Sequence, residues 1–196
     1  MFALIFGLSF LANAQDAKSN QPKGYQFTDI KRLPATSVKD QARAGTCWSW
    51  SGISFFESEM IRMGKEPIDL SAMYIVRHAY SDKATKFVRL HGSMNFAVGG
   101  AFCDVMHVIK NYGIVPMDVY KGLNYGEPNH AFGEIDDVLA GYVNAVIKNS
   151  NKKLSIAWKK GFDGILDAYL GEEPEKFEYK GKEYTPRTFA DEVVGL

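Results

Sequence analysis

The feature that most constrains the fold of this 196-residue chain is the helical spacing of its apolar residues. Apolar side chains recur every three or four positions in several segments, which predicts amphipathic helices there. These segments run from about Cys47 to Gly64, over a shorter stretch at 70–80, and over 102–112, 138–147 and 158–169. Residues 81–100 show no clear period, and 113–128 is predicted to be irregular loop.

Strand patterns are scarce. The segment FEYKGKEY, residues 177–184, predicts a small hairpin that turns at Lys180-Gly181. After it, Thr185 is suited to cap a last helix that has Pro186 at its first position and runs to the chain end. The chain is therefore predicted to be mostly helical.

The N-terminal residues 1–14, MFALIFGLSFLANA, carry no charge and close on a small-x-small site. This pattern predicts a signal peptide cleaved before Gln15, and hence an exported protein, periplasmic or secreted. The segment is too short to span a membrane, and the alternative is a buried N-terminal helix. Residues 15–36 are polar and interrupted by prolines, which is typical of an extended arm. Basic and acidic residues balance at 23 each, so nucleic acid is not an expected partner.

Two cysteines, Cys47 and Cys103, are too few for a disulfide scaffold, and we expect them not to be bonded to each other. Cys103 and His107 lie four positions apart on one predicted helical face, which would suit a second dyad or half of a metal site. No further ligand pair accompanies them. The favoured interpretation is a core cysteine beside a surface histidine, with no metal and no cofactor.

The segment VKDQARAGTCWSWSG, residues 38–52, joins a polar loop to the first predicted helix. A thiol attacks as its thiolate, and a helix N-terminus supplies partial positive charge and free N–H groups. The backbone N–H of Cys47 is then free to face a developing oxyanion, and the Gln41 amide suits a second donor. Trp48 is placed to shield the site from water. The segment therefore predicts acyl transfer at Cys47, and the alternative is a small buried cysteine.

These residues resemble the papain-like cysteine peptidases, whose signature around the nucleophile is C-G-[SA]-C-[WY]. The matching residues are 44–48, and the preceding 38–41 resembles the Val-Lys-x-Gln of that family. The resemblance implies that Cys47 is the nucleophile and Gln41 the oxyanion-hole donor. It also implies an α+β fold overall, of which residues 37–196 form the helical N-terminal part without the β-rich half.

Two later segments, LSAMYIV and GGAFCDVMHVIKNYGIVP, are similar to family segments as well. By that resemblance Gly99 and Gly100, together with Trp48, are substrate-binding residues, because a glycine lets a peptide backbone approach closely. Ala44 stands where the secreted plant and lysosomal members have a structural cysteine. This departure, with Thr46 and the insertion at 81–98, favours the bleomycin hydrolase and aminopeptidase C branch.

A cysteine peptidase also needs a histidine base and a residue that orients it, expected about 130–150 residues beyond the cysteine in this family. That window opens at Phe177, and no histidine or asparagine follows. Of the four histidines, His130 in an Asn-His-Ala-Phe context is the candidate base that remains open. His78 and His91 are interpreted as surface or loop residues.

The sequence therefore predicts a thiol peptidase of the aminopeptidase type, present in part and inactive alone. Its predicted partners are a peptide substrate and a missing C-terminal half, and the complete protein is a candidate homo-oligomer. The alternative is a non-catalytic peptide-binding protein on the same scaffold. A redox protein is disfavoured because the C-x-x-C spacing is absent.

Overall fold

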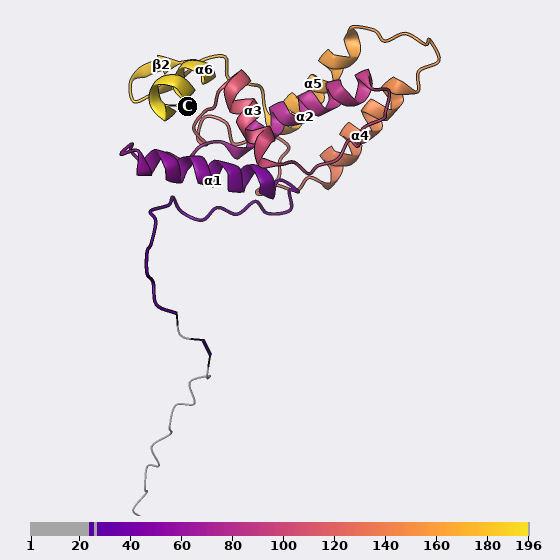
Figure 1. Ribbon diagram of the computed structural model, residues 1–196. Coiled ribbons are helices and arrows are strands. Elements are labelled where there is room, and N and C mark those ends of the chain that lie inside the picture. Colours follow the sequence, from indigo (N-terminus) through magenta and orange to yellow (C-terminus); the bar gives the residue numbers. More distant parts are fainter. Residues whose placement is uncertain (1–23, 26, 196) are drawn as a thin grey trace, which may run out of the picture. The chain divides into compact units, whose positions relative to one another are not determined.

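The computed structural model describes residues 24, 25 and 27–195, and divides into one unit up to Arg32 and a second from Leu33 onward (Figure 1). The predicted signal peptide at residues 1–14 lies outside the described residues. The described part of the first unit contains no helix or strand, and the same holds for residues 33–41. Every element discussed below belongs to the second unit.

The second unit is mostly helical, as predicted. Its longer helices are α1 (Cys47–Arg62), α2 (Ala72–Arg89), α3 (Phe102–Tyr112), α4 (Gly133–Ile147) and α5 (Ala157–Leu170). The strands β1 (Phe177–Tyr179) and β2 (Lys182–Tyr184) form the predicted antiparallel hairpin, in which Phe177 faces Tyr184. None of the helices in the described part of the chain combines the length and apolar character that a bilayer crossing needs.

Helix α2 is longer than the sequence predicted. The prediction of a short helix over 70–80 is wrong, because the apolar face continues through the buried Ala84 and Phe87. Polar residues on that face hid the helical period. Ser81, for example, is buried because it donates a hydrogen bond to Asp163 of α5 at 2.8 Å. The buried and hydrogen-bonded Ser81 therefore interrupts the apolar period in the sequence but does not end the helix.

The last helix also differs from its prediction. Thr185 accepts a hydrogen bond from the Thr188 N–H at 3.1 Å, and so caps α6 (Pro186–Phe189) as expected. A π-helical turn, η1 (Ala190–Val194), follows directly. It ends at Gly195, whose φ of 80° is left-handed, so the helix does not continue as predicted.

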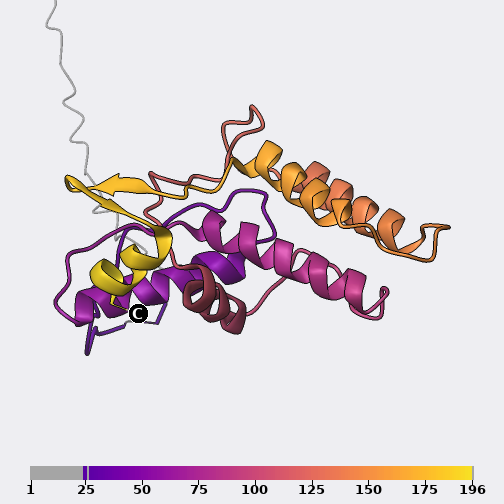
Figure 2. The ribbon, with the colours of Figure 1, turned by 90° about the horizontal axis from the view of Figure 1, so that it is seen from above.

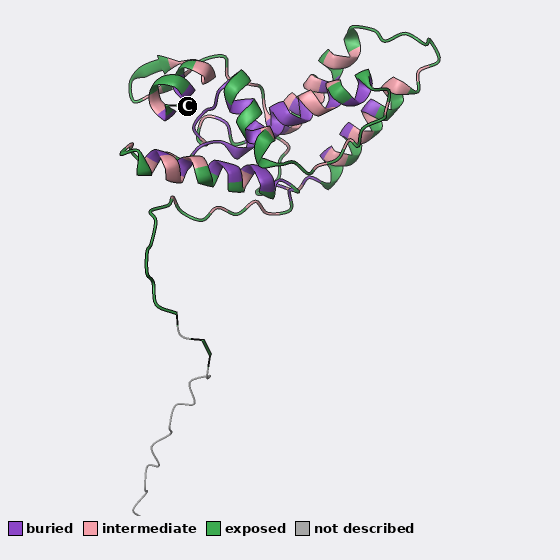
Figure 3. Cartoon of the chain, viewed as in Figure 1, coloured by how far each residue is buried: buried purple, intermediate pink, exposed green. Residues whose placement is uncertain are grey.

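Helix α2 lies at the centre of the second unit, in contact with α1, α3, α4 and α5. Figure 2 shows α4 and α5 side by side along it, and Figure 3 shows buried residues concentrated on α2 and on one side of α1. The loop at 113–120 is irregular, as predicted, and inserts the fully buried Ile114 and Val115 into the core. This core supports α1 and the loop that precedes it.

Candidate active site

Cys47 is the first residue of α1, as the sequence predicted, and its side chain is exposed. The carbonyl of the buried Thr46 accepts the Ser49 N–H at 2.9 Å and the Trp50 N–H at 3.3 Å, which closes the first helical turn. Within residues 33–195, the backbone N–H of Cys47 donates to no other group. A thiol and an unpaired N–H therefore stand together at a helix N-terminus, the arrangement that stabilises developing negative charge.

Gln41 stands in a turn ahead of Cys47. Its carbonyl accepts the Ala44 N–H at 3.3 Å, and Ala42 has a left-handed φ of 51°. Arg43, the next residue, pairs with the loop that contains His130. Its N–H donates to the His130 carbonyl at 2.9 Å, and its carbonyl accepts from Phe132 at 3.3 Å. The turn that carries Gln41 is thus fixed by backbone pairing on its far side.

A buried carboxylate that the sequence analysis missed anchors the start of this loop. Glu57 of α1 is 1% exposed, accepts the Leu70 N–H at 2.8 Å and binds Lys39 at 2.9 Å. Thr36 donates to the same carboxylate. Burial alone would lower the pKa of Lys39, but hydrogen bonds to Asp69 and Glu57 raise it. The sequence signal that could have revealed this buried carboxylate is an acidic residue on the apolar face of a predicted helix.

Trp48 and Gly100 are in direct contact. Trp48 is 7% exposed, and its indole N–H donates to the Val98 carbonyl at 3.3 Å. A Cβ placed on Gly100 would lie 2.5 Å from the indole, whereas one on Gly99 would meet nothing within 4 Å. Glycine at position 100 is therefore required by the tryptophan inside the fold. The structure therefore brings two predicted site residues, Trp48 and Gly100, into contact, and Trp48 directly follows Cys47 in the chain.

Gly100→Ala is expected to destabilise the protein by about 1–3 kcal/mol, because the new methyl group would overpack the indole. Gly99→Ala is the matched control and is expected to change the unfolding free energy by less than about 0.5 kcal/mol. Urea unfolding followed by tryptophan fluorescence measures both. Equal destabilisation by the two variants would contradict the contact with Trp48.

Two histidines are buried among aromatic rings in the structure. Both lie far from Cys47 in the sequence. His78 of α2 is 4% exposed and stacks on Tyr112 with ring centroids 4.2 Å apart, so its interpretation as a surface residue is wrong. Burial, then the charges of Arg77 and Lys159, lower its pKa to about 3. His130 is 9% exposed, has no partner for Nδ1 within the described residues and has its pKa lowered by burial.

The other two histidines are exposed. His91 lies in the turn after α2, as interpreted, and His107 lies on α3 with Nε2 3.2 Å from Asp82. Cys103 is exposed too, so its interpretation as a core cysteine is wrong. The short helix α3 buries only Val105, Val108 and Ile109, on its other face. Both cysteines are free thiols, and no group of three metal-ligating side chains is found among the described residues.

The burial of His78 is expected to make the folded protein less stable in acid. Its folded pKa lies below the unfolded value of about 6.5, so the unfolded chain binds more protons between pH 6.5 and 3. The corresponding stability is present above pH 6.5 and is lost as the pH falls towards 3. His78→Phe keeps an aromatic ring against Tyr112 but has no group that titrates. Between pH 7 and pH 4 its unfolding free energy is therefore expected to fall by on the order of 3 kcal/mol less than that of the parent.

Urea unfolding at pH 7 and pH 4 measures this effect, with the exposed His91→Gln as the control that keeps the parent profile. A His78→Phe variant with the pH dependence of the parent would contradict it.

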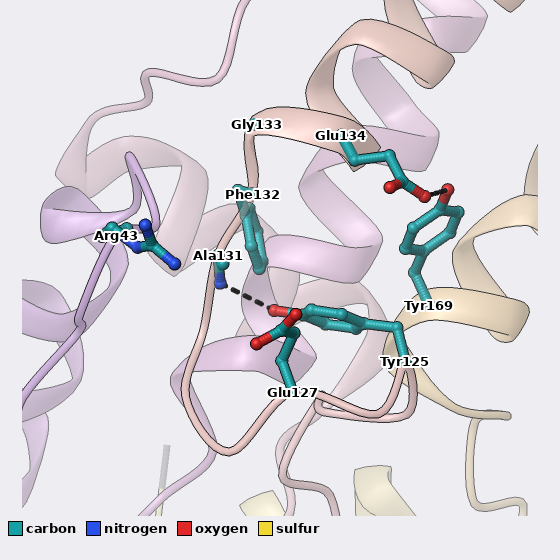
Figure 4. Close-up of a pocket in the computed structure, with 8 residues that line it drawn as sticks. All are labelled: Arg43, Tyr125, Glu127, Ala131, Phe132, Gly133, Glu134 and Tyr169. Atoms are coloured by element: carbon teal, nitrogen blue, oxygen red, sulfur yellow. Dashed lines mark hydrogen bonds between the residues drawn. The ribbon is translucent and has the colours of Figure 1, made fainter.

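A cavity of about 510 Å³ adjoins the Gln41 turn (Figure 4). Arg43 points towards it from the turn, and Tyr125, Glu127, Glu134 and Tyr169 line the opposite side. The Tyr125 hydroxyl accepts the Ala131 N–H at 2.8 Å, and Tyr169 donates to Glu134. The size is that of a small-ligand site, and its charged groups are of both signs.

Comparisons with known proteins identify the family and the fold of the chain. Residues 22–157 match the family model of the papain family cysteine proteases. The chain is 28% identical over 92 residues to "Cathepsin B-like CP2" of Giardia intestinalis, which covers 42% of this chain and 31% of that protein. It is similar in fold to the crystal structure of PepW from Lactobacillus rhamnosis, with a TM-score of 0.57 at 20% identity.

The PepW match covers 84% of this chain and 45% of that one, so this chain spans less than half the length of either relative. The family model, by contrast, extends over most of the chain, including the loop at 38–46, helix α1 and residues 99–100. The chain belongs to the papain family of cysteine proteases.

Proposed function

We propose that this chain is the nucleophile-bearing half of a peptidase that cleaves peptide bonds through an acyl-enzyme on Cys47. The observation that carries the proposal is the exposed Cys47 at the N-terminus of α1, with its own N–H unpaired within residues 33–195. A structural cysteine would instead be buried.

In the proposed reaction the Cys47 thiolate attacks the carbonyl carbon of the scissile peptide bond. The Cys47 N–H and the Gln41 side-chain amide donate to the resulting oxyanion. The C–N bond then breaks, the leaving amine takes a proton from an acid, and a thioester remains. Water hydrolyses the thioester and regenerates the thiol.

The acid and base in this scheme are proposed to be a histidine outside this chain, oriented by an asparagine. Three features of the molecule support this. His78 lies among aromatic rings and His91 follows α2, while His107 faces Asp82. Both relatives are also more than twice as long as the regions they share with this chain.

Within the family we propose an aminopeptidase of the bleomycin hydrolase and aminopeptidase C type, acting after export. The support is the departure at Ala44 and the insertion at 81–98, of which residues 81–89 extend helix α2. The proposed export rests on the sequence of residues 1–14 alone.

A non-catalytic peptide-binding protein is the second candidate. One observation favours it. Within the described structure, His130 is the only histidine in a loop that pairs with the Gln41 turn, and His130 is buried. Such a protein would bind peptides beside Gly100 without cleaving them.

An assay with aminoacyl and dipeptidyl fluorogenic substrates separates the candidates. The purified chain alone is expected to show no Cys47-dependent turnover. Adding the β-rich half of a papain-family peptidase is expected to restore it, and we call this mixture the reconstituted peptidase. Failure to restore turnover despite binding of the two halves would favour the peptide-binding candidate. Robust turnover by the chain alone would assign the base to one of its own histidines, with His130 the first to replace.

A further inference from the structure

The segment Val98–Gly100 is held by three side chains of the fold. The Trp48 indole N–H and the Tyr80 hydroxyl both donate to the Val98 carbonyl, at 3.3 and 3.4 Å. Lys83 of α2 donates from Nζ to the carbonyl of Gly99. The segment is therefore anchored to α2 and α1 at two successive carbonyl groups.

The Lys83 ammonium lies among groups that stabilise a cation. It stands 5.3 Å from the centre of the Trp48 ring and 5.6 Å from that of Tyr80. Burial lowers the pKa of Lys83, while the charge of Asp104 opposes this effect. The aromatic faces and the Gly99 carbonyl offset part of the desolvation cost. These contacts thus hold the Lys83 side chain in one place, unlike the side chain of an ordinary surface lysine.

The bond to Gly99 also fixes the direction of the next N–H. The Gly99 carbonyl and the Gly100 N–H belong to one planar trans peptide unit, in which the two groups point in opposite directions. Because Lys83 holds the oxygen, the Gly100 N–H is aimed away from the ammonium. Gly100 is exposed, and its N–H donates to no group in residues 33–195.

We infer that Lys83 is a positioning residue, which presents the Gly100 N–H to a backbone carbonyl of a bound peptide. By occupying the Gly99 carbonyl, Lys83 also removes that oxygen from the acceptors a peptide could use, and so restricts pairing to Gly100. The inference rests on the proposed function of the site.

The test uses thiol–disulfide exchange, because that reaction needs no histidine. The Cys47 thiolate attacks a 2-pyridyl disulfide, forms a mixed disulfide and releases pyridine-2-thione, which is followed by absorbance. Three probes are compared on the full chain with Cys103→Ser, which removes the second exposed thiol. One is a simple alkyl disulfide, one carries a dipeptide, and one carries the dipeptide with a methylene in place of its internal carbonyl.

Lys83→Met is expected to slow the dipeptide probe by about three- to tenfold, which is the loss of one hydrogen bond. The rates of the simple and methylene probes are expected to stay within about twofold. Lys83→Arg retains a donor and is expected to restore most of the rate. Lys86→Met, on the exposed side of the same helix, is the matched control and is expected to behave as the parent.

Each other outcome has one interpretation. If Lys83→Met slows both dipeptide probes equally, or neither, the inference is overturned while the proposed function stands. If the parent reacts no faster with the dipeptide probe than with the simple one, peptide recognition at Gly100 fails and both fall. Circular dichroism establishes that Lys83→Met is folded, and loss of folding in that variant moves the test to Lys83→Arg against Lys83→Gln.

Discussion

Replacing Cys47 by alanine is expected to lower peptide turnover by the reconstituted peptidase at least about 10⁴-fold. Without the sulfur no thioester forms, and the donors at the N-terminus of α1 have no oxyanion to stabilise. Initial rates with a dipeptidyl fluorogenic substrate measure the loss. Peptide affinity is expected to change less than about threefold, because the Gly100 segment is intact.

Cys103→Ser is the matched control for this experiment, since Cys103 is the other exposed free thiol. It lies on α3, outside the Gln41 turn and the N-terminus of α1, and is expected to leave turnover unchanged. Retention of turnover in Cys47→Ala, or its loss in Cys103→Ser, would remove Cys47 from the role of nucleophile.

Gln41→Ala is expected to lower kcat in the reconstituted peptidase by about 10²–10³-fold, the usual cost of one oxyanion-hole donor. KM is expected to change little, because a donor to the oxyanion, which is the role proposed for Gln41, acts in the transition state and not on the bound substrate. Gln41→Glu keeps the shape of the side chain but has no amide donor, so it is expected to be at least as slow. Initial rates over a range of substrate concentrations separate kcat from KM.

The exchange of Cys47 with a simple disulfide supplies the control for Gln41, because that reaction has no oxyanion. Gln41→Ala is expected to leave this exchange rate within about twofold of the parent. A parallel fall in exchange rate and in kcat would mean that the substitution has disturbed the turn at 41–44, and that Gln41 is not a donor.

Local patterns predicted the elements whose signals lie within a few residues. Helix α3 ends at Gly113, with a φ of 87°, and the hairpin turns at Lys180-Gly181, where both residues have positive φ. These positions were predictable because a helix period and a turn residue act through the backbone of their own segment. The start of α1 at Cys47 was predictable for the same reason.

The burial of single residues such as His78 and Cys103 was not predictable from the sequence. His78 was interpreted as exposed and Cys103 as buried, and both interpretations are wrong. A histidine enters a core when aromatic neighbours such as Tyr74 and Tyr112 enclose it, and these rings come from α2 and from the end of α3. The position of a residue in the sequence indicates on which side of a helix its side chain lies. Whether the side chain is buried depends on what packs against that side.

The sequence by itself determined that Cys47 begins a helix after a polar turn, since the helix period and the glycine at position 45 are local signals. Only the tertiary structure decided how that turn and the glycine segment are held. Glu57 binds Thr36 and Lys39, Trp48 contacts Gly100, and Lys83 binds Gly99. Each of these contacts joins α1 or α2 to a loop segment elsewhere in the chain, and forms only where tertiary packing brings the two together. The periodic pattern of a segment does not identify such a distant partner, even where, as at Glu57, a charge interrupts an apolar helical face.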